Sequence, residues 1–247
     1  MPCHPAKVTG CQRNANVLST TQPAISSLMC YSGFVETFPY TIDYYITVDG
    51  RKPFKEWLDR FRGITARQKV RIRLDRVRLG NLGRNRSVGD GVYEIKIDYG
   101  PGYRVCYGLE EKALILLLLG GDKSSQEYIG MTTKGEEKVS KKTTTYQEDL
   151  IESLKDLREA AAYLNAAMEE GDRALFLLAL RNVAEAQGGM ASVAEKAHLN
   201  RENLYRMLSK KGNPEIKSIV NLLHSMGLRL TVEPKRKVTK IKVKKAA

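Results

Sequence analysis

Six consecutive apolar residues, Leu114–Leu119, constrain the fold of this chain more than any other segment. A short apolar run that ends at turn residues is typical of a strand buried within a sheet. No apolar run in the chain approaches the 18 or more residues that a membrane-spanning helix needs. A Gly-Gly pair follows, and then the polar segment Asp122–Ser125. We therefore expect a central strand whose end presents polar side chains through flexible glycines, either as a solvated turn or as a functional site.

The residues before this run predict an α+β domain. Aromatic and β-branched residues in Glu36–Thr47 favour a strand. Apolar residues fall on one face of two predicted helices, one beginning at Pro53 and one spanning Ala66–Leu79. Val92–Asp98 alternates as a half-buried strand, and a Gly-Pro-Gly turn separates it from a strand at Tyr103–Tyr107. This order favours a small antiparallel sheet with two N-terminal helices on one face.

The charge of the chain is strongly positive and unevenly distributed. With 41 Lys and Arg against 28 Asp and Glu, the formal net charge is +13, which favours polyanionic partners such as nucleic acid or an anionic membrane surface. Residues 34–130 hold 17 basic and 13 acidic residues, residues 131–172 hold 6 and 10, and residues 173–233 hold 9 and 5. The acidic middle segment is able to cover a basic neighbour electrostatically. The alternative is a solvated pair of helices.

Composition predicts five segments: a disordered leader at 1–33, an α+β domain at 34–130, a polar linker at 131–145, a helical region at 146–233 and a basic tail at 234–247. The four cysteines form no Cys-x-x-Cys pair and the three histidines are far apart, so we expect neither a disulfide framework nor a metal site. The N-terminus lacks the apolar stretch of a secretory signal. We expect a cytoplasmic protein without metal, cofactor or membrane partner.

Residues 190–228 have the spacing of a helix-turn-helix. Ser192 and Glu195 fit a capping box for a short helix, and Asn200 fits the N-cap of the next one. Polar residues at the start of the second helix would reach base edges in the major groove, and a lysine after it would contact phosphate. The predicted DNA-binding residues are Ser192, Asn200, Arg201, Glu202, Asn203, Arg206 and Lys210. The alternative is a helical bundle without DNA contact.

The sequence from Tyr146 to Pro234 resembles the addiction-module antidote proteins, which are HigA-like antitoxins of type II toxin–antitoxin systems. The resemblance rests on the stretch "AAYLNAAMEEGDRALFLLALRNVAEAQGGMASVAEKAHLNRENLYRMLSKKGNPEIKSIVNLLHSMGLRLTVEP". It covers nearly the whole family domain. It implies an all-α helix-turn-helix domain that binds operator DNA, usually as a dimer, and neutralises a cognate toxin.

Residues 34–126 resemble the addiction-module killer proteins, a HigB/RelE-type branch of the RelE/ParE toxin superfamily. Four motifs carry the resemblance in the family's order: "KPFKEWLDRF", "ARQKVRIRLDRVRLGNLG", "VGDGVYEIKIDYGPGYRVCYG" and "LLLLGGDKSSQ". The resemblance implies a RelE/ParE-like fold with a basic concave site for RNA, and ribosome-dependent members cut mRNA. Killer proteins usually continue into a C-terminal helix, whereas polar sequence follows Gln126 here, and the toxin-like part has no histidine.

The resemblance also implies roles for individual residues. Arg104 matches the family's phosphate-binding arginine, Lys123 stands at the basic strand-end position, and Tyr128 corresponds to a tyrosine that stacks or transfers protons in some relatives. Lys96 is a third candidate cation, and Glu94 shares its strand face as a candidate general base. The alternative for these last two is a surface ion pair. On the second predicted helix we expect Arg71 and Arg73 to bind RNA, the alternative being a solvated basic face.

Together these features predict a fused toxin–antitoxin protein. The helix-turn-helix would bind operator DNA, and the antitoxin part would neutralise an mRNA-interferase-like domain that is masked or inactive in the fusion. One alternative is a latent ribosome-dependent mRNA endonuclease released by cleavage of the linker. Another is a non-catalytic interaction module. The expected partners are operator DNA, mRNA and the ribosome, with an intramolecular toxin–antitoxin contact and a homodimer.

Overall fold

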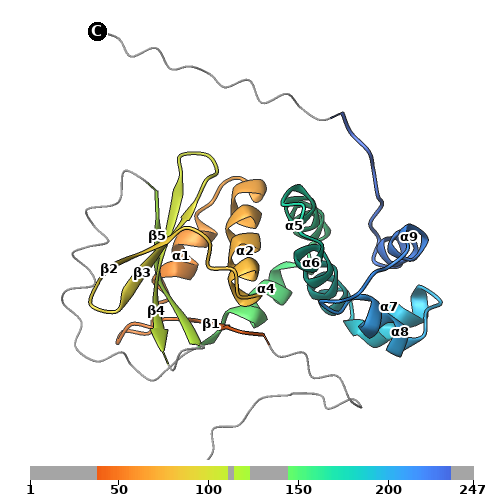
Figure 1. Ribbon diagram of the computed structural model, residues 1–247, viewed down its shortest axis with the longest axis horizontal. Coiled ribbons are helices and arrows are strands. Elements are labelled where there is room, and N and C mark those ends of the chain that lie inside the picture. Colours follow the sequence, from red (N-terminus) through yellow and green to blue (C-terminus); the bar gives the residue numbers. More distant parts are fainter. Residues whose placement is uncertain (1–37, 111–113, 123–143, 235–247) are drawn as a thin grey trace, which may run out of the picture. The chain divides into compact units, whose positions relative to one another are not determined.

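A mixed β-sheet forms the first half of the structure, a computed structural model that describes residues 38–110, 114–122 and 144–234 (Figure 1). The strands are β1 Thr41–Tyr44, β2 Asn85–Gly89, β3 Val92–Ile97, β4 Tyr103–Glu110, β5 Leu114–Gly121 and β6 Thr144–Thr145. Their order in the sheet is β2-β3-β4-β5-β1-β6. β5 lies between β4 and β1, which confirms the central strand expected from the apolar run.

Strand β1 differs from the antiparallel arrangement that was expected, because it pairs parallel to β5, with Ile42 opposite Ile115. The chain leaves β1, passes through two helices and three strands, and returns beside β1 with β5 running in the same direction. The other neighbours in the sheet are antiparallel. The composition of a strand does not specify the direction of its neighbour. The parallel pairing of β1 with β5 was therefore not predictable from the sequence pattern.

The edge strand β2 was not predicted, because all five of its residues are exposed and it has no apolar alternation. It pairs with β3 through a tight turn in which Asp90 and Gly91 both have positive φ, at 50° and 75°. The Asp-Gly pair is a strong hairpin signal in its own right. It was the one local feature from which this hairpin was predictable.

Two helices, α1 Pro53–Asp59 and α2 Ile64–Arg78, pack on one face of the sheet. Pro53 begins α1, as predicted, because its fixed φ suits the first helical position. The core between helices and sheet holds Phe54, Leu58, Val70, Leu74, Val77, Ile95, Val105, Ile115 and Leu117. The predicted α+β class is confirmed by this arrangement.

The glycine pair after the apolar run does not act as a flexible hinge. Gly120 and Gly121 continue β5 and pair with Val105 and Arg104 of β4. A Cβ at Gly120 would lie 2.0 Å from Cε3 of Trp57, so only glycine lets the indole of α1 lie on the strand. The first glycine is therefore a packing residue.

Gly120→Ala is expected to lower the free energy of unfolding by about 1–3 kcal/mol, because the added methyl group forces Trp57 out of its site. Urea unfolding followed by the fluorescence of Trp57, the single tryptophan, measures the loss. Gly108→Ala is the matched control, since a Cβ at that position on β4 meets nothing within 4 Å. Equal stabilities of the two variants would contradict the packing role of Gly120.

Six helices form the second half of the described structure: α4 Tyr146–Ser153, α5 Leu157–Glu169, α6 Arg173–Ala186, α7 Gly189–Lys196, α8 Arg201–Met207 and α9 Ile216–Ser225. The side chains of Asp156 and Asp172 cap α5 and α6 by accepting from backbone N–H groups. No helix within residues 38–110, 114–122 and 144–234 is both long and apolar enough to cross a membrane. The expected leader, residues 123–143 and the tail from residue 235 lie outside the described residues.

The expected capping box at Ser192 is wrong. Helix α7 begins at Gly189, after Gly188 with a φ of 115°, so Ser192 lies within the helix rather than at its N-cap. The chain turns sharply after α6, and a left-handed residue at the turn favours glycine. The glycine pair at 188–189 therefore sets the start of the helix earlier than the Ser-x-x-Glu pattern suggests.

Candidate functional site

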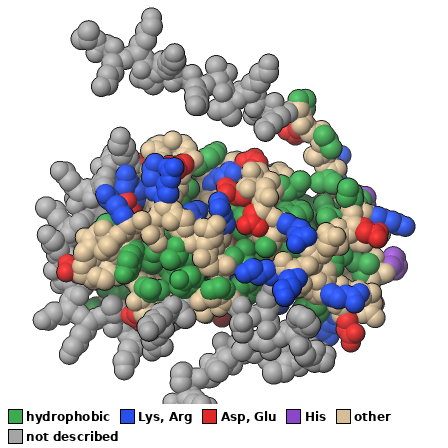
Figure 2. Space-filling model, viewed as in Figure 1, with side chains coloured by type: hydrophobic (Ala, Val, Ile, Leu, Met, Phe, Trp, Pro, Cys, Tyr) green, Lys and Arg blue, Asp and Glu red, His purple; other side chains and the backbone are tan. Residues whose placement is uncertain are grey.

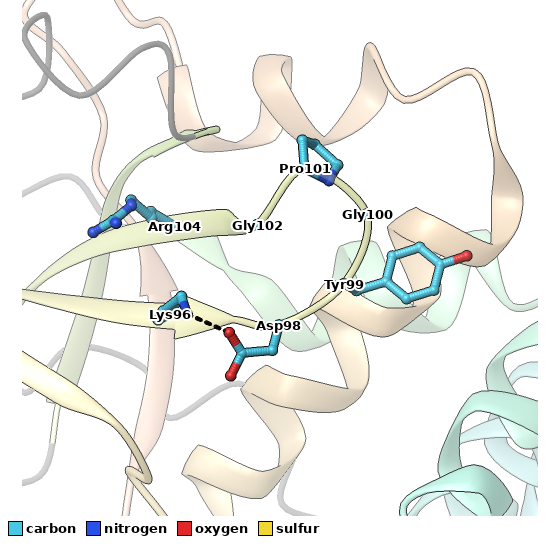
Figure 3. Close-up of a pocket in the computed structure, with 7 residues that line it drawn as sticks. All are labelled: Lys96, Asp98, Tyr99, Gly100, Pro101, Gly102 and Arg104. Atoms are coloured by element: carbon cyan, nitrogen blue, oxygen red, sulfur yellow. Dashed lines mark ion pairs between the residues drawn. The ribbon is translucent and has the colours of Figure 1, made fainter. Parts of the chain in front are cut away.

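An open pocket of about 330 Å³ lies at the turn between β3 and β4. Its lining includes Lys96 and Arg104, which face each other across the two antiparallel strands (Figure 3). The turn that joins the strands contains Gly100 and Gly102 with φ of 57° and 82°, values that glycine adopts readily. The turn thereby brings two of the predicted catalytic cations to one site.

Each cation of the pocket has a carboxylate partner. Lys96 Nζ lies 2.5 Å from Oδ1 of Asp98, and this hydrogen bond lowers the pKa of Asp98 below its ordinary value. Arg104 donates from Nη1 to Glu94, whose Oε1 also lies 3.2 Å from Nε of Arg86. Lys96 therefore pairs with Asp98 rather than with Glu94.

Glu94, the predicted general base, lies between two arginines. Its side chain is only 4% exposed and is held between the guanidinium groups of Arg104 and Arg86. The Nε atom of Arg104 is buried and makes no hydrogen bond within the described part of the chain. Glu94 is thus placed to orient Arg104. The other two predicted catalytic residues, Lys123 and Tyr128, lie outside the described residues.

Helices α7 and α8 carry the predicted DNA-binding residues. Asn200 caps α8, as predicted, by accepting from the backbone N–H of Glu202 at 2.8 Å. Glu202, Asn203, Arg206 and Lys210 are exposed, whereas Ser192 and Arg201 are half-buried. Arg206 Nη2 donates to Asn203 at 2.7 Å, which joins two of the exposed side chains. Figure 2 shows Lys and Arg side chains interspersed with Asp and Glu in the right half of the view.

The two halves of the chain meet where α2 packs on α5. Arg67 and Arg71 both approach Glu159, and Gln68 donates to the same carboxylate. The side chain of Arg71 is only 6% exposed. It also donates to Ser153 of α4, so α4 and α5 cover this predicted RNA-binding residue. The second predicted RNA contact, Arg73, instead donates to the carbonyl groups of Asn81 and Leu82.

Two more cations of α2 extend the contact. Lys69 Nζ lies 2.7 Å from Glu169, and Arg76 Nη1 lies 2.6 Å from Glu170. Both acidic residues belong to residues 131–172, the segment in which acidic residues outnumber basic ones. Opposite charges therefore line the contact along the length of both helices.

A closed ring of polar side chains lies beneath these ion pairs. Tyr163 donates to Asp75 and accepts from Asn182 at 2.8 Å, Gln147 donates to Asn182 at 3.0 Å, and Arg78 completes the ring between Gln147 and Asp75. Asp75, Tyr163 and Asn182 are at most 2% exposed. The ring joins α2 to α4, α5 and α6. Its members gave no signal in the sequence, because their partners lie up to 88 residues away.

Burial raises the pKa of Asp75 above its ordinary value, so the folded chain binds this proton more readily than the unfolded chain. The stability that this group contributes is therefore greatest below the unfolded-state pKa of about 4, and it falls as pH rises from there. We expect Asp75→Asn, which cannot ionise, to lose less stability than the natural chain between pH 4 and pH 7. Urea midpoints measured across this range test the difference, and parallel curves would contradict it.

The comparisons with known proteins concern the helical half. Residues 144–234 match the family described as "Probable addiction module antidote protein". One uncharacterised protein of Haemophilus influenzae is 42% identical over 74 residues, which are 30% of this chain and 75% of the relative. A second from the same organism is 33% identical over 88 residues, 36% of this chain and 90% of the relative. No solved structure matches the chain significantly. Through its C-terminal region, the chain belongs to the family of probable addiction module antidote proteins.

Proposed function

We propose that this chain is a toxin–antitoxin fusion in which the antidote region binds operator DNA through α7 and α8 and neutralises the N-terminal domain. The antidote family supports a toxin–antitoxin role for the C-terminal region. The observation that carries the neutralisation is the contact of α2 with α5, where four basic residues of the N-terminal domain pair with carboxylates of the antidote region. The N-terminal domain is then the toxin-like partner, of RelE/HigB type.

The geometry of α7 and α8 supports DNA binding. A four-residue connection, residues 197–200, joins two short helices, with His198 at a φ of 54° and Asn200 as the cap of the second helix. The first turns of α8 present Glu202, Asn203 and Arg206 to solvent. Arg and Asn are the side chains that read guanine and adenine bidentately in the major groove. We assign α8 as the recognition helix of a helix-turn-helix.

Arg206→Ala is expected to weaken operator binding by about 1–3 kcal/mol, because it removes a candidate base contact. The DNA probe is the region upstream of the gene that encodes this chain. The dissociation constant is measured by electrophoretic mobility shift at fixed salt. Lys217→Ala in α9 removes the same charge from an exposed position outside α8 and is the matched control. Unchanged affinity of Arg206→Ala would show that α8 is not the recognition helix.

A second candidate function is a latent ribosome-dependent mRNA endonuclease. The observation that favours it is the pocket of Lys96 and Arg104, which the described residues of the antidote region do not line. Two cations beside an open pocket are suited to stabilise the charge that develops on a phosphate under attack. A protease site inserted at residues 131–143 of the full chain, cleaved in cells, tests this function. Growth arrest that Arg104→Ala abolishes would support it, and unimpaired growth after complete cleavage would refute it.

A further inference from the structure

The basic face of α2, defined here as Arg67, Lys69, Arg71, Arg76 and Arg78, carries more charge than its partners neutralise. Three carboxylates of the antidote region oppose these five cations, namely Glu159, Glu169 and Glu170. The fifth cation, Arg78, pairs within its own helix with Asp75 and donates to the neutral side chain of Gln147. The covering helix thus leaves the face with an excess of positive charge.

Two guanidinium groups of this face donate hydrogen bonds from only some of their N–H groups. Arg71 contacts Ser153 and Glu159 through Nη1 alone, and Arg76 contacts Glu170 through Nη1 alone. The Nε atoms of both are buried and have no acceptor among the described residues. Arginine matches an oxyanion best when it donates two parallel N–H bonds, as it does to phosphate. Arg71 and Arg76 therefore each keep an Nε donor that the carboxylates of α5 do not engage and that a phosphate oxygen is able to accept from.

We propose that the basic face of α2 is a binding surface for the phosphodiester backbone of a single-stranded nucleic acid, which α5 occupies as an intramolecular competitor. Arg67 and Arg78 are 11 residues apart, or about 16 Å along the helix, which is enough to follow several phosphates of one strand. This proposal rests on the proposed function, because it names the ligand from which the antidote region excludes the N-terminal domain. Nucleic acid and α5 compete, so each weakens the binding of the other.

The test compares two charge-matched variants of the full chain. Glu169→Gln with Glu170→Gln removes two carboxylates that face α2. Glu148→Gln with Glu152→Gln removes two from α4 that make no contact with α2 among the described residues. Fluorescein-labelled 12-nucleotide oligouridylate and oligodeoxythymidylate serve as probes, read by fluorescence anisotropy. We expect the first variant to bind at least about fivefold more tightly than the second with one or both probes, and the preferred probe identifies RNA or DNA as the source.

Two further measurements localise the effect. Adding Lys69→Gln and Arg76→Gln to the first variant should abolish the gain in affinity, and oligonucleotide should speed hydrogen exchange of Leu157–Glu169 in the unmodified chain. Equal affinities of the two charge-matched variants would overturn the proposal, because net charge would then explain binding. A gain that survives loss of the α2 cations would also overturn it. If this test fails while Arg206→Ala still weakens operator binding, the proposed function stands without this ligand.

Discussion

Glu159→Ala is expected to lower the free energy of unfolding by about 3–5 kcal/mol, because it breaks a buried ion pair from one side. Glu159 accepts from Arg67 and Gln68 and lies 3.5 Å from Arg71. Its removal takes away the one carboxylate that the 6% exposed Arg71 contacts among residues 38–110, 114–122 and 144–234. Urea unfolding followed by circular dichroism for the helices and by Trp57 fluorescence for the N-terminal domain measures the change in both halves.

Glu152→Ala provides the matched control for this prediction. Glu152 lies on the neighbouring helix α4, is 72% exposed at its side chain, and pairs only with Lys155 among the described residues. A surface pair of this kind contributes about 0–1 kcal/mol. If Glu159→Ala were as mild as Glu152→Ala, the ion pairs between α2 and α5 would not hold the two halves together.

Tyr163→Phe is expected to cost about 3 kcal/mol, since removing one hydroxyl takes away the hydrogen bonds that two buried atoms, Oδ2 of Asp75 and Nδ2 of Asn182, make to it. The ring of phenylalanine keeps the apolar packing of the tyrosine, so the loss reports the hydrogen bonds. The midpoint of urea unfolding gives the magnitude. Tyr99→Phe, at a side chain that is 37% exposed, should change stability by no more than about 0.5 kcal/mol. A Tyr163→Phe chain as stable as Tyr99→Phe would show that the polar ring adds nothing.

The elements that could be predicted from the sequence are those with a strong local pattern. The apolar run predicted β5, and Pro53 predicted the start of α1. The cap at Asn200 was predictable because a side-chain cap needs only the adjacent turn of helix. Exposed β2 and the parallel pairing of β1 with β5 were not found, because neither leaves an apolar pattern in its own residues.

The candidate sites also divide into those with a local sequence pattern, which were predictable, and those without one, which were not. Turn chemistry and strand register brought Lys96 and Arg104 together, and both effects are local. The interface of α2 with α5 depends on side chains some 90 residues apart, such as Arg67 and Glu159. Arg71 was assigned to RNA from its charge alone, and only the structure shows which carboxylate and hydroxyl cover it. Charge segregation pointed to such a contact without specifying its residues.

The two-residue strand β6 has a consequence for how the protein is made. It opens the antidote-family region and pairs with Asp43 and Tyr44, on the side of β1 that faces away from β5. An uncovered strand edge is a template for aggregation. The N-terminal domain leaves the ribosome first, so among the described residues the strand partner of this β1 edge follows only when Thr144 and Thr145 have been synthesised. The antidote-family region thus supplies the strand that covers this edge of β1, and we expect a chain truncated before Thr144 to expose the edge.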